Sequence, residues 1–154
     1  MANKPDSIDF YLLPDGGITK LAGQLVEKSN AAGKKAVIYC DAAQAEAQST
    51  HLWCMHDLSF YAHGTDDEEG AEFATIWLST KSDKNQIKAE YAICTSWQNL
   101  PDPNNFERLF FVFDGTDEAA MTAARDKWRT WSEAYQGKCR YFAKTEQGGW
   151  QQKR

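Results

Sequence analysis

The sequence has few cysteines and no long apolar run, and each shortage excludes a class of protein. Its four cysteines, Cys40, Cys54, Cys94 and Cys139, are widely spaced and form no C-x-x-C pair, which argues against a disulfide framework. No apolar run reaches the roughly 18 to 20 residues of a membrane-spanning helix, and the amino end has no secretory apolar core. We therefore expect a cytoplasmic protein with reduced thiols and no membrane contact.

Positive charge is also in short supply. The chain has 17 Lys and Arg against 22 Asp and Glu, a formal net charge of -5 at pH 7. A protein of this charge repels phosphate backbones as a whole, which excludes broad electrostatic binding to nucleic acid. Six tryptophans offer rings on which bases can stack, but the net charge argues against single-stranded DNA as the primary ligand. We expect any contact with DNA to be indirect.

The apolar pattern predicts one α/β domain over residues 1–154, with a central, mostly parallel sheet of about five strands. With 154 residues and 42% hydrophobic content, the chain suits a single core. Helical spacing alternates with short apolar runs, the order that builds a sandwich of helices and sheet. The predicted strands are 8–13, 35–40, 73–79, 90–96 and 108–114, and the predicted helices are 18–33, 41–53 and 116–137.

Local signals mark the ends of these elements. Asp41 and Thr116 stand where a helix N-cap is expected, and Gly33 and Gly137 stand where a left-handed residue would end a helix. The segment 63–72, "HGTDDEEGAE", has no periodicity and is rich in carboxylates, so it is predicted to be a solvated loop. The segment after Gly137 is predicted to hold at most one final strand.

The predicted last helix carries two rows of side chains at helical spacing. One row is an apolar stripe expected to face the core: Met121, Ala124, Trp128, Trp131 and Tyr135. The second row is displaced sideways and mixes basic and aromatic residues: Arg125, Trp128, Arg129 and Ser132. Trp128 belongs to both rows, so we expect it at the border between core and solvent.

Two arginines beside a tryptophan predict recognition of a carboxylate next to an apolar group. The guanidinium is a planar fork of donors that matches a carboxylate, and the indole supplies an apolar wall. The acidic carboxyl end of a peptide has both features. The alternative is a solvated arginine pair on an amphipathic helix, which the pattern alone does not exclude.

Several ordered segments resemble one known family, the chi subunit of bacterial DNA polymerase III holoenzyme. They are "FYLL" at 10–13, "GKKAVIYC" at 33–40, "LWCMHDLSFYAH" at 52–63, "ARDKWRTWSEAYQG" at 124–137, and a Gly-Trp near the carboxyl end. The resemblance implies a Rossmann-like three-layer fold without catalysis or cofactor. It also implies an adaptor between the clamp-loader complex and the acidic carboxy-terminal tail of single-stranded DNA-binding protein.

The resemblance also implies two binding sites. The tail would bind Arg125, Trp128 and Arg129, with Arg125 holding the carboxylate, and the psi subunit of the clamp-loader complex would bind Trp53 and Phe60. Four departures from the family pattern bear on these sites: Ser132 replaces a frequent arginine, Asp114 replaces an apolar pocket residue, Ala62 replaces a proline, and the acidic "TDDEEGAE" at 65–72 replaces a neutral Gly-rich stretch. For Trp53 and Phe60, ordinary core packing is the alternative.

The competing hypothesis is a small nucleotide- or phosphate-binding enzyme on the same kind of sheet. "FDGTD" at 113–117 is similar to a phosphatase motif, but the position of its nucleophile is Val112. "PDGGIT" at 14–19 lacks the glycines of a dinucleotide-binding turn. Cys40 lacks an oxyanion loop, so a buried structural thiol is favoured. Four residues could ligate a metal but lack the spacing of a complete site: His51, Cys54, His56 and His63.

Overall fold

The protein is built on one eight-stranded sheet. The computed structural model describes residues 5–14, 17–54, 63–65, 74–145, 147 and 149–153. The strand order is β3-β4-β2-β5-β6-β1-β7-β8, and every neighbouring pair is parallel except β7 with β8. The strands are β1 (Ser7–Leu13), β2 (Ala36–Tyr39), β3 (His63–Thr65), β4 (Ile76–Ser79), β5 (Tyr91–Cys94), β6 (Arg108–Asp114), β7 (Cys139–Lys144) and β8 (Trp150–Lys153).

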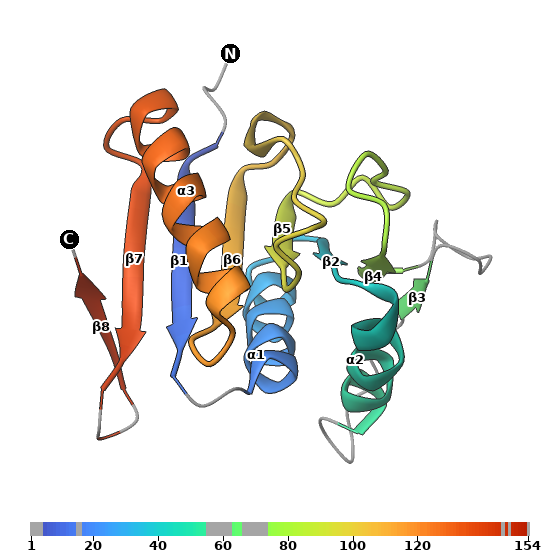
Figure 1. Ribbon diagram of the computed structural model, residues 1–154. Coiled ribbons are helices and arrows are strands. Elements are labelled where there is room, and N and C mark those ends of the chain that lie inside the picture. The colour runs from blue at the N-terminus through green and yellow to red at the C-terminus, as the bar shows by residue number, and fades with distance from the viewer. Residues whose placement is uncertain are drawn as a thin grey trace.

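Helices cover both faces of this sheet, and the α/β prediction is confirmed. Helix α3 (Glu118–Ala134) crosses one face over β6 and β7, and α1 (Ile18–Ala31) packs on the other face against β2, β5 and β6. Helix α2 (Ala42–Cys54) lies beside α1 and contacts β3 and β4. The strands β7 and β8 form the edge of the sheet beyond α3 (Figure 1).

Each face of the sheet has its own apolar core. Under α3, Phe10 and Phe111 pack with Trp131, and under α1 a separate cluster includes Ile38 and Val112. Strand β6 contributes to both clusters, because a central parallel strand covered on two sides needs apolar residues at consecutive positions. The run Leu109–Phe113 is buried throughout.

The sheet is larger than predicted. All five predicted strands are present, but the described chain adds β3, β7 and β8. Strand β3 begins at His63, so the prediction of a loop at 63–72 is wrong for His63–Thr65, and 66–72 lies outside the described residues. Three residues in a polar context carry too weak an alternation to mark an edge strand. The segment after Gly137 forms two strands, where at most one was predicted.

The helix boundaries follow the predicted signals with one correction. The Asp41 carboxylate accepts a hydrogen bond from the Gln44 amide (2.8 Å), as an N-cap does, and Gly33 and Gly137 have positive φ angles of 77° and 79° just past helix ends. Thr116 does not cap α3. Asp117 does, accepting from the amides of Ala119 and Ala120.

A charged group lies in the middle of the sheet. The Asp9 side chain in β1 is fully buried and binds one arginine from each neighbouring strand. Arg140 donates from Nε and Nη2 to the two carboxylate oxygens (2.8 Å each), and Arg108 donates from Nη2 (2.7 Å). The two guanidiniums are partly exposed, so the carboxylate is the group that depends on this pairing.

No helix in the described residues has both the length and the apolar character that crossing a membrane requires.

Candidate peptide-binding site

The predicted apolar stripe of α3 does face the core. Ala124 and Trp131 are buried in the cluster beneath the helix, and Met121, Trp128 and Tyr135 are partly buried against it. The stripe docks α3 onto the sheet. Its neighbouring row, which includes Arg125 and Arg129, is thereby turned toward solvent.

Trp128 lies at the border of the core, as its membership of both rows predicts. Its ring packs edge-on against Phe10 (centroids 5.2 Å apart) and against Tyr141 of β7 (5.7 Å). The side chain is only half-buried. Because two aromatic rings hold the indole in place, its open part forms a fixed apolar surface that costs little entropy to use in binding.

Arg125 and Arg129 are exposed and one helical turn apart. Across the described ranges, neither guanidinium forms an ion pair with a carboxylate. Two like charges at positions i and i+4 destabilise a helix slightly. Neither arginine lies in the last turn of α3, where a basic residue would stabilise the helix. The pair therefore does nothing evident for the stability of α3, and its donors are available to a ligand.

Tyr141 is a member of this site that sequence reasoning missed. Its ring packs edge-on against Trp128, with centroids 5.7 Å apart. Burial raises the pKa of its phenol, and the positive charge of Arg125 partly opposes that rise. The sequence pattern predicted at most one strand in the segment after Gly137, which contains Tyr141. It gave no sign that this residue packs against α3. The site consists of Arg125, Trp128, Arg129 and Tyr141, and we call it the α3 site.

Ser132 and Asp114, two residues that depart from the chi-family pattern, have different surroundings. Ser132 is half-buried and lies next to Cys139 of β7, where its hydroxyl works against the burial that raises the pKa of that thiol. Asp114, at the end of β6, accepts hydrogen bonds from the Thr116 amide (2.8 Å) and hydroxyl (2.7 Å). It lines a separate pocket to which Arg125 does not contribute.

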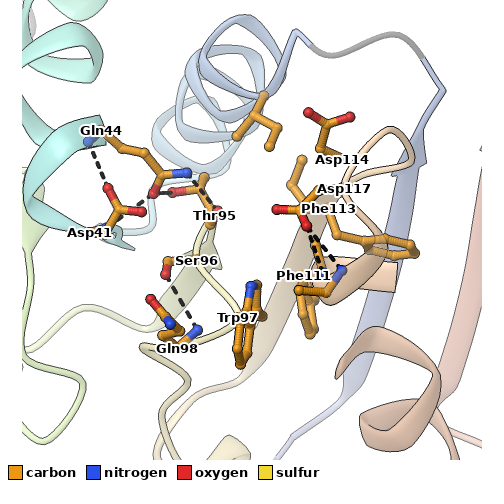
Figure 2. A pocket seen from close by; sticks show the side chains of 14 residues that line it. Asp41, Gln44, Thr95, Ser96, Trp97, Gln98, Phe111, Phe113, Asp114 and Asp117 are labelled. Carbon is orange, nitrogen blue, oxygen red and sulfur yellow. Dashed lines mark hydrogen bonds between the residues drawn. The ribbon is translucent and has the colours of Figure 1, made fainter. Parts of the chain in front are cut away.

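That pocket lies at the carboxyl ends of β2, β5 and β6 and has a volume of about 390 Å³. Figure 2 shows Asp41 on one side of it and Asp114 and Asp117 on the other, with Trp97 between them in the lower part of the view. Its 14 lining residues include no lysine and no arginine. In open α/β sheets this edge is where phosphate ligands bind, usually at a helix N-terminus.

The three carboxylates of the pocket act as structural acceptors. Asp41 and Asp117 bind the first amides of α2 and α3, and Asp114 binds Thr116. The amides that would hold a phosphate are therefore occupied by the protein's own carboxylates, and the negative charge around them repels an anion. This arrangement speaks against the nucleotide-binding alternative.

The predicted psi-facing residues lie at or beyond the edge of the described part of the structure. Trp53 belongs to α2, but its side chain is outside the described part of the structure, and Phe60 lies outside the described residues altogether. His56 is also outside them. In the described ranges, no group of three or more metal-capable side chains comes together.

The buried thiols have no features of nucleophiles. Cys40 and Cys94 are both fully buried, and burial raises the pKa of Cys94 far above its usual range. A thiol that stays protonated is a weak nucleophile. These side chains serve as small apolar groups in the two cores.

Comparison with known proteins identifies a family. No curated protein matches the chain at a significant level. A family model described as DNA polymerase III chi subunit, HolC, matches residues 6–136, which include β1, α3 and every element between them. Three residues of the α3 site, Arg125, Trp128 and Arg129, fall within the match, and Tyr141 falls just beyond it. The chain belongs to the DNA polymerase III chi subunit family.

Proposed function

We propose that this chi-family protein is a non-catalytic adaptor that binds the acidic carboxy-terminal tail of single-stranded DNA-binding protein and links it to the clamp-loader complex. The observation that carries the proposal is the α3 site. Two exposed arginines that pair with no carboxylate among the described residues flank a half-buried tryptophan, and the pair offers α3 no stabilisation of its own.

The chemistry of the site fits the end of an acidic, apolar peptide. Arg125 lies three residues before Trp128 on α3, so a carboxylate held by its bidentate guanidinium would lie beside the aromatic pair of Trp128 and Tyr141. The open part of the Trp128 indole is adjacent, and an apolar last side chain can cover it. Acidic residues before the last one would face Arg129, one turn further along α3.

Arg125→Ala is expected to weaken tail binding by about 2 kcal/mol, roughly 30-fold in Kd, because it removes one partner of a desolvated charge pair. Isothermal titration calorimetry with a synthetic acidic peptide ending in phenylalanine measures this directly. Lys84→Ala, an exposed cation in the loop after β4, is the matched control and should leave the affinity unchanged. Equal affinities for the Arg125 variant and the control would remove Arg125 from the site.

The second contact of the adaptor, with the psi subunit, is proposed at Trp53 and Phe60. Trp53→Ala and Phe60→Ala are each expected to lower psi affinity by about 30-fold, the usual effect of truncating an aromatic hot spot. Co-purification of psi and calorimetry with the tail peptide should be run on the same variants. Loss of psi binding with normal tail binding supports the assignment, and normal psi binding by both variants contradicts it.

A further inference from the structure

The face of the sheet opposite α3 is left uncovered at the β8 edge. Strand alternation places Tyr11, Arg140 and Phe142 on the same face as α1, because the residues between them pack under α3. Helix α1 packs against β2, β5 and β6, so β7 and β8 extend past it (Figure 1). We call this surface the β7–β8 face and define it by Tyr11, Arg108, Arg140, Phe142, Lys144 and Trp150.

Three aromatic rings lie next to one another on this face. Tyr11 and Phe142 are stacked, with centroids 5.1 Å apart and planes 17° from parallel. Trp150 meets Tyr11 edge-on at 5.1 Å and is 36% exposed. A half-open row of rings held by its own contacts is a platform on which planar groups can stack.

Positive charges border the row at both ends. At one end, Arg140 stacks over Phe142 with its guanidinium 5.5 Å from the ring centroid, and Arg108 lies 4.7 Å from the Phe110 ring. At the other end, Lys20 and Lys144 line a hollow of about 220 Å³ together with Trp150.

These four cations outnumber the acid among them. Among the described residues of this surface, Asp9 neutralises one arginine, which leaves an excess of three positive charges, and Glu107, just before β6, is bound to Lys34. The β7–β8 face is thus locally basic on a protein whose net charge is -5.

We propose that the β7–β8 face binds single-stranded DNA. Stackable rings with cations at both ends match the alternating bases and phosphates of a single strand, whereas a purely acidic peptide without apolar side chains would leave the rings unused. A duplex does not fit, because its bases are already stacked. The net charge of the whole protein keeps the contact weak in isolation, so the face acts as an auxiliary contact near the DNA.

The test is fluorescence anisotropy of a labelled dT20 strand with the full-length protein at 50 mM NaCl. Trp150→Ala should raise Kd at least 5-fold, and Trp150→Phe, which keeps a ring, should restore most of the affinity. Lys20→Ala with Lys144→Ala should lower the slope of log K against log salt by about 1.4, from two lost phosphate contacts on a single strand. Circular dichroism checks that each variant is folded.

The matched controls are Trp97→Ala, an equally exposed tryptophan at the carboxyl edge of the sheet, and Lys81→Ala with Lys84→Ala. Both should bind dT20 like the unaltered protein, and the Lys20 and Lys144 variant should keep its affinity for the tail peptide. No binding of dT20, equal losses in the controls, or stronger binding of a polyglutamate peptide than of dT20 would each overturn the proposal. A tenfold preference for rU20 would overturn the assignment to DNA.

Discussion

Replacing Arg108 and Arg140 together by methionine is expected to lower the free energy of unfolding by about 3–5 kcal/mol. The two substitutions strand the Asp9 carboxylate, which is fully buried and receives three hydrogen bonds from these side chains. A buried charge without a partner is among the most costly defects in a folded protein. Methionine keeps most of the apolar stem, so lost packing contributes little.

Urea unfolding followed by circular dichroism measures the effect, and a third substitution identifies its cause. Adding Asp9→Leu removes the stranded carboxylate and should recover most of the lost stability, because replacing a whole buried ionic group by apolar residues is often neutral. The Lys34→Met variant, which breaks a partly exposed ion pair with Glu107, should behave much like the unaltered protein. A double variant that is as stable as the unaltered protein would show that the Asp9 carboxylate does not need its partners.

Trp131→Ala is expected to cost about 3–5 kcal/mol of stability, the usual loss for truncating a large aromatic in a core. The Trp131 ring is 5% exposed and packs 5.9 Å from Phe10 and 6.5 Å from Phe111, measured between centroids. Its loss leaves a cavity beneath α3 that the central strands cannot close, because β1 and β6 are held on both sides by neighbouring strands.

The comparison with Trp128→Ala separates stability from binding on a single helix. Trp128 is half-buried, so its truncation should cost less stability than that of Trp131, while tail-peptide affinity should fall at least tenfold. Urea unfolding and calorimetry on both variants give the two measurements. If the folded Trp131 variant lost tail affinity while the Trp128 variant kept it, the α3 site would be wrongly placed.

Local patterns were enough to predict much of the α/β chain. The helical spacing of Met121, Ala124 and Trp131 predicted which side of α3 is buried, and the run 108–114 predicted β6 with its observed bounds. These features depend on residues a few positions apart, where the backbone itself sets the geometry.

Distant contacts could not be predicted in this way. Asp9 meets arginines 99 and 131 residues away, and Tyr141 reaches Trp128 only because β7 pairs with β1. The edge strand β3 was also missed, since its three residues form a strand through pairing with β4.

The sequence alone therefore determined the class of fold, the buried stripe of α3 and the exposed arginine pair beside it, because helical and strand periodicity are properties of neighbouring residues. Only the tertiary structure decided that Tyr141 packs against Trp128, that Asp9 lies between two arginines, and that aromatic rings gather on the β7–β8 face. Those arrangements depend on which strands become neighbours, and strand order is set by the packing of the whole chain.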